Sequence, residues 1–343
     1  MIHRKQGFAR IAILGNPSDG FYGKTIAALI RNFAATVEVW ESPELSIVPD
    51  REHDPTVFES LESLRATAAA QGYYGGLRLI LATCKKFADV CREHGIALPA
   101  RSFTVRYGTD IPRQVGLGGS SAIINAAFHA LMEFHHVPPA AFPLPVLPNI
   151  IRQVETHELS IQAGLQDRVI AVYGGLVYMD FDRELMESRG YGDYVRLDPS
   201  LLPPMFIAWG GPGGESGQAH SPIRVLWDRG DPKVREGMER FASLAAEGWE
   251  ALRERDVKRL GDLMDANFGL RLELYGEQAI GEQTMRLVRV AREHGCPAKL
   301  PGSGGAAIGL MPEEPKAWEG LVKAYEAEGF RAERAIVADQ VPT

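Results

Sequence analysis

The residues best suited to chemistry lie in the stretch IPRQVGLGGSSAIIN, where a glycine run ends in two serines and passes into a helical pattern. Gly116, Gly118 and Gly119 permit backbone conformations closed to other residues, so successive N–H groups can point at one phosphate. Ser120 or Ser121 is expected to cap the following helix, whose positive end faces the same phosphate. The stretch predicts an anion-binding loop, although an ordinary glycine turn fits a lone run equally well.

Two further glycine-rich loops, GNPSDGFYGK and PGSGGAA, lie near the two ends of the chain and favour the anion-binding interpretation. Between them, Asp167 sits in AGLQD, a glycine-led turn where folding alone does not call for a carboxylate. A surface pair with Arg168 or a helix cap is the alternative role for Asp167. The chain therefore offers three candidate phosphate or ligand loops and one candidate catalytic acid.

Composition limits the class of protein. At 343 residues the chain exceeds what one core usually supports, which predicts two domains. A formal net charge of −7 argues against nucleic acid or an anionic membrane as a partner. No run approaches the roughly 20 apolar residues of a membrane span, and MIHRKQGFARIAIL turns strand-like too early for a signal peptide. A cytoplasmic enzyme is expected.

Cysteine and histidine patterns give no metal site. Cys84, Cys91 and Cys296 are odd in number and are expected to be reduced core residues. The adjacent His135 and His136 lack the spacing of metal ligands.

Strands and helices alternate around the loops. Apolar patterns predict strands at 10–14, 37–40 and 103–107, a short apolar segment at 25–32, and helices at 77–94 and from the middle loop to 136. Residues 42–60 mix prolines with acids and are expected to form a lid or a poorly ordered loop. Residues 138–148 carry five prolines and should be irregular.

The later part of the chain begins with a helix at 151–162 and a strand hairpin over VYGGLVYMDF. Paired prolines in LDPSLLPP mark a domain boundary, which gives domains 1–200, with the phosphate-binding loop at 112–122, and 201–343. The second domain is expected to hold these elements in order: a strand at 205–209, a loop at 210–217, helices over 233–274 and 282–294, a loop entering a strand, a helix, and a strand at 331–337.

The order of the three loops, with the helix-capping loop second, resembles the GHMP family of small-molecule kinases, which includes galactokinase, homoserine kinase, mevalonate kinase and phosphomevalonate kinase. Four segments, LGNPSDGFYGKT, IPRQVGLGGSSA, AGLQDRVIAVYGGLVYMDF and PGSGGA, are similar to those of glucuronokinases in the same order. The resemblance covers most of the chain. It implies an α+β fold with an N-terminal ribosomal-protein-S5-like domain and a C-terminal ferredoxin-like domain.

The resemblance also implies ATP and Mg²⁺ as cofactors. Phosphoryl transfer needs cradled phosphates, a divalent cation and a group beside the attacking hydroxyl. Ser120 or Ser121 and the carboxylate of Glu155, twelve residues before Asp167, are the expected metal ligands, with Glu158 as the competitor. The residues expected to bind the nucleotide are Gly116, Leu117, Gly118, Gly119, Ser120, Ser121, Ala122, Gly302, Ser303, Gly304 and Gly305.

By the same resemblance, Asp167 orients the acceptor hydroxyl and takes its proton in the transition state. Arg10 or Lys24 stabilises the transferred phosphoryl group, although Arg10 could simply begin a strand. Relative to the family pattern, the middle loop carries one extra glycine, Gly119, and the third loop begins with Pro301.

Substrate contacts are expected from the first loop and from a segment near residue 220. Asn16, Ser18 and Asp19 match family positions that bind sugar hydroxyls, and Asn16 replaces an acid. A uronic acid would add a carboxylate, for which a bidentate arginine is suited. The candidate residues beyond the first loop are Arg113, Ser216, His220 and Arg224.

Arg113 could instead bind nucleotide phosphates, and His220 could cap a helix. The predicted function is transfer of the γ-phosphate of ATP to the anomeric 1-hydroxyl of D-glucuronate. Another sugar 1-kinase or a heptose-phosphate kinase is the alternative enzyme, and an ATP- and sugar-binding sensor is the alternative outside enzymes. A monomer and a homodimer are both compatible with the sequence.

Overall fold

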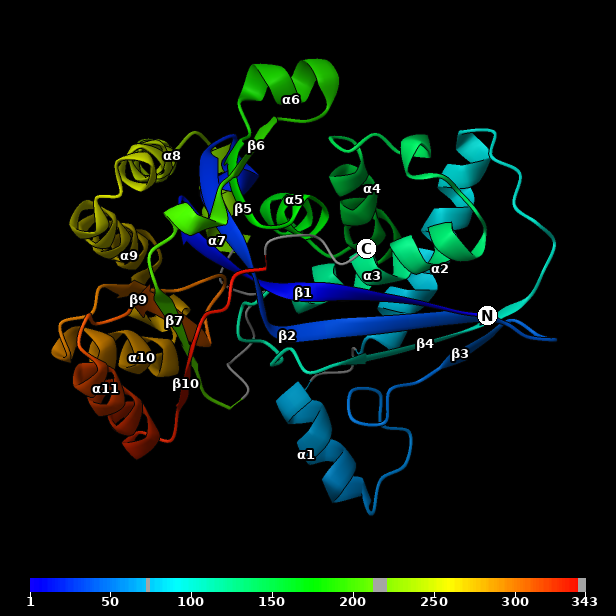
Figure 1. The fold of residues 1–343 in the computed structure, drawn as a ribbon, viewed down its shortest axis with the longest axis horizontal. Helices are drawn as coiled ribbons and strands as arrows, with labels where there is room; N and C mark the ends of the chain where they lie inside the picture. The colour runs from blue at the N-terminus through cyan, green and yellow to red at the C-terminus, as the bar shows by residue number, and fades with distance from the viewer. Residues whose placement is uncertain (72–74, 212–220, 339–343) are drawn as a thin grey trace.

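The computed structural model describes residues 1–71, 75–211 and 221–338, and two long antiparallel strands run through its centre (Figure 1). Strand β1 (Ile2–Leu14) pairs with β2 (Lys24–Glu41) from Ile2 opposite Trp40 to Leu14 opposite Ile26. Both are longer than the short strands predicted at 10–14 and 37–40, and β2 includes the apolar segment at 25–32. The pairing explains the length, because each strand completes hydrogen bonds of the other on both sides of register shifts at Phe8/Ala9 and Ala12/Leu14.

The first sheet is completed on the other edge of β2. Strand β4 (Phe103–Thr109) pairs with the end of β2 and β5 (Leu176–Asp180) with its beginning, so the two share one edge. The outer strands are β3 (Ser46–Val48), beside β4, and β6 (Asp193–Leu197), beside β5. Part of the stretch expected to be a lid or loop is therefore a strand.

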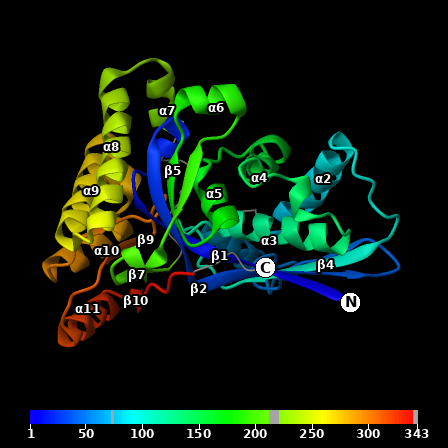
Figure 2. The ribbon, with the colours of Figure 1, turned by 45° about the horizontal axis from the view of Figure 1, so that its top comes forward.

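Helices cover one face of this sheet (Figures 1 and 2). Helix α3 (Gly119–Phe134) packs on β1 and β2, and α2 (Leu77–Glu93) packs on α3. The other helices of this part are α1 (Leu61–Gln71), α4 (Leu147–Gln153) with a π-helical turn at Val154–Glu158, α5 (Gln166–Tyr173) and α6 (Arg183–Arg189). Short 3-10 turns lie at Ser18–Phe21, Pro139–Ala141 and Pro199–Leu201.

The second sheet is antiparallel, with the order β10-β7-β9-β8. Its strands are β7 (Met205–Trp209), β8 (Ala298–Lys299), β9 (Ala306–Leu310) and β10 (Arg331–Arg334). The helices of this part are α7 (Ser221–Asp228), α8 (Pro232–Glu254), α9 (Val257–Ile280), α10 (Glu282–Glu293) and α11 (Pro315–Ala327). Four strands with packed helices agree with the expected ferredoxin-like unit.

The two parts are joined by more than the chain connection near residue 200. Helix α8 packs on β2 of the first sheet as well as on α9. Beyond β10 the chain returns to the first sheet, where Ala338 N donates to Leu29 O (2.9 Å) and Arg31 N to Ile336 O (2.7 Å). The segment at 335–338 thus belongs by contact to both parts.

Two local predictions near the site are wrong. VYGGLVYMDF is the end of helix α5 followed by β5, not a hairpin. The middle loop is not capped by a serine, because Gly118 is the N-cap residue and Ser120 and Ser121 lie in the first turn of α3. The helix at 77–93 and the strands at 103–109 and 205–209 match the sequence predictions closely. Among the described residues, no helix combines the length and apolar character needed to cross a bilayer.

Candidate active site

The middle loop has the backbone shape of an anion cradle. Gly116 and Gly118 have φ of 73° and 75°, which L side chains rarely adopt. The N–H groups of the first turn of α3 have no carbonyl partner within the helix and point out of its positive end. In addition, the buried Ser121 Oγ lacks a hydrogen-bond partner in the part of the chain that is described. These groups fit a bound phosphate and its cation.

The third loop lies directly against the middle loop. A Cβ on Gly116 would come within 2.8 Å of Ser303 N, and a Cβ on Gly302 within 2.2 Å of Gly116 O. Ala12 N of β1 donates to Pro301 O at 3.0 Å, which fixes the start of the third loop. Glycine at these positions therefore allows two backbone segments far apart in sequence to meet around one ligand.

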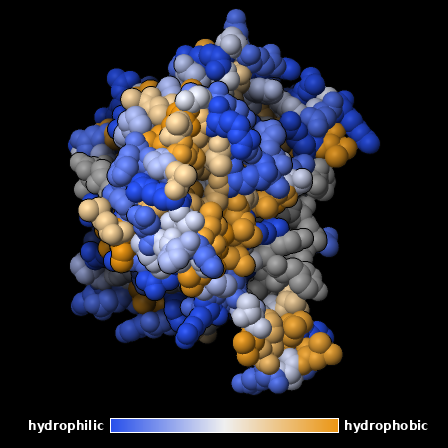
Figure 3. Space-filling view, turned by 90° about the vertical axis from the view of Figure 1, so that its right-hand side faces the viewer, coloured by the Kyte–Doolittle hydropathy of each residue, from blue (hydrophilic) through white to orange (hydrophobic). Residues whose placement is uncertain are grey.

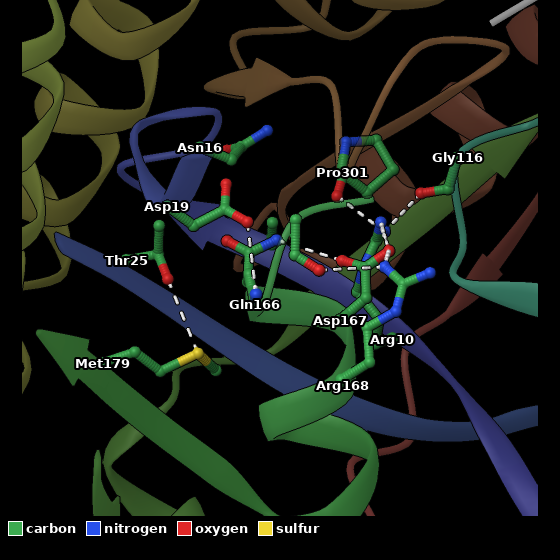
Figure 4. A network of polar contacts seen from close by, with 12 residues as sticks. Arg10, Asn16, Asp19, Thr25, Gly116, Gln166, Asp167, Arg168, Met179 and Pro301 are labelled. Atoms are coloured by element: carbon green, nitrogen blue, oxygen red, sulfur yellow. Dashed lines mark hydrogen bonds and ion pairs between the residues drawn. The ribbon is translucent and has the colours of Figure 1, made fainter. Parts of the chain in front are cut away.

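Arg10 and Asp167 form the centre of the site (Figure 4). Arg10 Nε donates to Asp167 Oδ1 at 2.7 Å and its NH2 to Oδ2 at 2.8 Å, a bidentate ion pair. The remaining Arg10 nitrogen donates to Gly116 O and, at 2.9 Å, to Pro301 O. A single buried guanidinium thus connects the candidate catalytic acid to both phosphate loops.

Asp167 lies in the first turn of helix α5, and the glycine-led segment AGL precedes that helix. Next to it, Gln166 N donates to Asp19 Oδ2 at 3.2 Å. Burial, together with the smaller effect of the nearby Asp167 charge, raises the pKa of Asp19 to about 6, although the Gln166 N–H, Arg10 and Arg168 act in the opposite direction. The first loop therefore brings a second carboxyl group beside Asp167.

The other residues of the first loop are held by the protein itself. Asn16 Oδ1 accepts a hydrogen bond from the buried Lys299 Nζ at 2.7 Å. Ser18 is fully buried, and its hydroxyl donates to Lys24 O at 2.9 Å. The ammonium group of Lys24 is ion-paired with Asp180 of β5. Of the two cations considered for the phosphoryl group, Arg10 is the one bonded to Asp167.

A cavity of about 1120 Å³ opens beside the middle loop. Its lining combines Gly118, Ser120 and Asp167 with apolar side chains such as Leu61 and Leu64 of α1. Leu61 is 82% exposed, and Figure 3 shows hydrophobic surface at the bottom, where α1 projects from the molecule. The cavity joins a polar phosphate cradle to apolar walls, as expected of a nucleotide site.

The two arginines considered for a carboxylate lie in different places. Arg113 lines this cavity, and its NH1 donates to His53 O at 3.2 Å. Arg224 of α7 is exposed and reaches the first loop, where its NH1 donates to Gly20 O at 2.7 Å. Ser216 and His220 lie outside the described residues.

The candidate metal carboxylate is buried in an ion pair. Glu155 is 5% exposed, and its Oε2 accepts from Arg168. Burial lowers the pKa of the Arg168 guanidinium to about 9. The competitor Glu158 is paired with Lys85 of α2 at 2.8 Å. Within the described ranges, no group of three or more His, Cys, Asp or Glu side chains forms a ready metal site.

Two buried cations near the site are absent from the sequence predictions. Lys299 is 1% exposed and Arg271 of α9 is 3% exposed. Lys299 directly precedes LPGSGG, so its position next to the third loop in the sequence could have indicated that it lies near the site. Arg271 lies on an amphipathic helix, where nothing in the local sequence distinguishes a buried arginine from a surface one.

Two glycine loops around an arginine–aspartate pair, beside a cavity of nucleotide size, define a small-molecule kinase. The models for the GHMP kinases N terminal domain and the GHMP kinases C terminal domain match residues 78–175 and 250–327. The chain belongs to the GHMP kinase family and transfers a phosphoryl group from ATP to an alcohol.

Curated relatives match nearly the whole chain. A probable glucuronokinase 2 and a glucuronokinase 1, both from Arabidopsis thaliana, are 43% and 42% identical over 97% of this chain and cover 90% and 91% of their own lengths. The galactokinase of Lactococcus lactis, solved with galactose, superposes with a TM-score of 0.76 at 14% identity, over 100% of this chain and 95% of its own. That structural likeness supports the two-part α+β fold.

Proposed function

We propose that this kinase phosphorylates the anomeric 1-hydroxyl of D-glucuronate to give D-glucuronate 1-phosphate. The observation that carries the proposal is the identity of 42–43% to glucuronokinases over 97% of the chain. The site chemistry supports it, because an arginine-held aspartate, a second carboxyl group and an amide are groups that bind sugar hydroxyls.

In the proposed reaction, Asp167 orients the acceptor hydroxyl toward the γ-phosphorus of ATP. The proton of the hydroxyl passes to Asp167 as the new O–P bond forms, since a carboxylate is a much weaker base than an alkoxide and does not remove the proton beforehand. Arg10 holds Asp167 in one orientation through two hydrogen bonds and keeps positive charge beside the loops that bind phosphate. ADP is the leaving group.

ATP is proposed to bind along the cavity, with its phosphates at residues 116–122 and 302–305 and its base against α1 and α2. Mg²⁺ is proposed to be held by Ser120 or Ser121 and by Glu155. Of the two carboxylate oxygens of Glu155, it is Oε2 that is bonded to Arg168. The unpartnered Ser121 Oγ supports this ligand set. When bound, the cation would neutralise charge between the β- and γ-phosphates.

The test is an ATP-consumption screen of the purified protein with Mg²⁺. The acceptors are D-glucuronate, D-galacturonate, glucose, galactose, mevalonate and a heptose phosphate, and the product is identified by phosphorus NMR. We expect turnover with glucuronate and a phosphorus signal coupled to the anomeric proton. Turnover of galactose or the heptose phosphate without turnover of glucuronate would replace the proposed substrate.

A further inference from the structure

One face of helix α9 is turned toward the first loop. Asn267, Arg271 and Tyr275 follow each other at intervals of four residues, which places them on one side of the helix. Gly15 N at the end of β1 donates to Asn267 Oδ1 at 2.8 Å. This bond fixes the face of α9 beside the segment that carries Asn16 and Asp19. The next turn of the helix therefore brings Arg271 to the edge of the candidate sugar site.

Arg271 is buried, and no carboxylate among the described residues is paired with it. It is 3% exposed, and its contact in the described part of the chain is the Tyr275 ring, 4.9 Å from the guanidinium carbon. The other buried arginines of the site differ, because Arg10 is paired with Asp167 and Arg168 with Glu155. A second polar group on the same face, the buried Asn267 Nδ2, also lacks a hydrogen-bond partner among the described residues.

An unpaired buried guanidinium needs an anion. A cation–π contact offsets only a small part of the free-energy cost of desolvating a buried charge. Burial accordingly lowers the pKa of Arg271, and attraction to the Tyr275 oxygen and to Asp19 acts in the opposite direction. A ligand that brings its own negative charge would remove this cost.

The triphosphate of ATP does not suit Arg271. The residues that line the nucleotide cavity include Arg10, Arg113 and Asp167, whereas Arg271 is not among them. Arg271 lies one helical turn after Asn267, which accepts from Gly15 N, and the charge of Asp19 in the first loop acts on it. Its anion is therefore a second one, on the acceptor and not on the phosphoryl donor.

We propose that Arg271 binds the carboxylate of the uronate substrate and so sets the preference for a uronic acid over a neutral sugar. This inference rests on the proposed function. Arg271 is not one of the two arginines that the sequence suggests for the carboxylate. Arg224 is exposed and paired with Asp228 at 3.3 Å, and Arg113 faces the nucleotide cavity. Arg271 alone of the three combines burial with an unmet charge.

The test compares wild type, Arg271→Gln and Arg271→Lys with D-glucuronate and with D-glucuronamide, its neutral analogue. Arg259→Gln is the matched control, because Arg259 is on the same helix but paired with Glu254 at 3.2 Å and 39% exposed. We expect Arg271→Gln to lower kcat/KM for glucuronate roughly 10- to 100-fold, mainly through KM. With glucuronamide the same variant should change kcat/KM by less than about threefold.

The outcomes separate the two proposals. Equal losses on both acceptors with an unchanged thermal midpoint would show that Arg271 only supports the fold, and would overturn the inference. If Arg271→Gln does not fold, Arg271→Lys tests the proposal. Lysine keeps the charge but lacks the planar guanidinium that can bind a carboxylate with two hydrogen bonds, so KM should rise for glucuronate alone. If the wild type is inactive on glucuronate but active on another anionic acceptor, only the proposed substrate is overturned. If the wild type is active on neutral acceptors alone, the proposed role of Arg271 is overturned.

Discussion

At the scale of single residues, the site depends on how charges are paired. Asp167 is bound by Arg10 at both oxygens, and Glu155 is bound by Arg168, so these two carboxylates are held in fixed positions by ion pairs. Asp19 is different, because burial and the neighbouring Asp167 disfavour its charge. The surroundings therefore distinguish Asp19 from the two ion-paired acids.

Asp167→Asn tests the assignment of the catalytic acid. The substitution keeps the shape of the side chain but removes the proton acceptor and half of the ion pair with Arg10. We expect kcat to fall about 100-fold or more, with little change in ATP binding. A coupled ADP-release assay and titration with an ATP analogue measure the two quantities. Asp262→Asn, at an exposed pair with Lys258 (2.7 Å), serves as the control; near-normal turnover in Asp167→Asn would refute the role.

Asp19→Asn tests the raised pKa. The pKa of Asp19 is near 3.8 when unfolded and about 6 when folded, so the folded state binds more protons between these values. Stability therefore falls as pH rises through this window, and the loss is complete above it. Asparagine removes the charge while its Oδ1 can still accept from Gln166 N. We expect a gain of about 1–3 kcal/mol in unfolding free energy above about pH 6 that vanishes near pH 4. Urea titrations across this range measure it, and a gain that does not vary with pH would contradict the explanation.

At the scale of elements, the two phosphate loops work as one unit because their backbones touch. Gly302→Ala would place a Cβ 2.2 Å from Gly116 O and 3.0 Å from an Arg10 nitrogen, both of which belong to the Arg10 network. We expect kcat/KM for ATP to fall about tenfold or more, since Arg10 and the cradle would both shift. Steady-state kinetics at varied ATP measures the loss.

The matched control for this substitution is Gly320→Ala in α11, where an added Cβ meets no atom within 4 Å. It should leave kinetics unchanged and raise stability by about 0.5–1 kcal/mol, because alanine is the better helix former. Equal kinetic effects of the two substitutions would mean that the loop contact is unimportant.

The loops and most elements could be predicted because their signals are local. Glycine and serine spacing marks the middle loop, and the apolar period marks α2. The length of β1 and β2 could not be predicted, because polar residues such as Arg31 and Asn32 interrupt the apolar pattern. They lie where the register of the two strands shifts, between Ile30 and Ala34, and they bond to the distant segment at 334–336 instead of to β1. The burial of Arg271 and Lys299 could not be predicted either, because segments distant in the sequence determine whether a cation is buried.

At the scale of the whole molecule, the end of β1 is where the two sheets meet. Lys299 of β8 donates to Ala12 O at 2.8 Å, to Asn16 Oδ1 at 2.7 Å and to Leu300 O at 2.6 Å. Arg10 adds its bond to Pro301 O, and Asn267 adds its bond to Gly15 N. The contacts that join the two parts of the chain thus also hold the loops proposed to bind the substrates. The same hydrogen bonds are therefore expected to affect both stability and activity.

Lys299→Met tests this coupling. Methionine fills similar space but leaves the Asn16 oxygen and two carbonyl groups without their donor, which should cost about 1–3 kcal/mol of unfolding free energy. Burial holds the pKa of Lys299 well below its usual value, and Arg271 and Arg10 lower it further. In the wild type the unfolded chain therefore binds the proton more tightly, and stability rises with pH until the unfolded lysine also loses its charge.

Methionine removes that pH dependence. The gap in unfolding free energy between wild type and Lys299→Met should therefore widen as pH is raised from about 7 to about 10. Urea unfolding of both proteins over this range measures the gap. Lys323→Met on the exposed surface of α11 should show neither the loss nor the pH dependence. A variant as stable as wild type at every pH would mean that the buried side chain of Lys299 does not join the two sheets, because its acceptors would then need no donor.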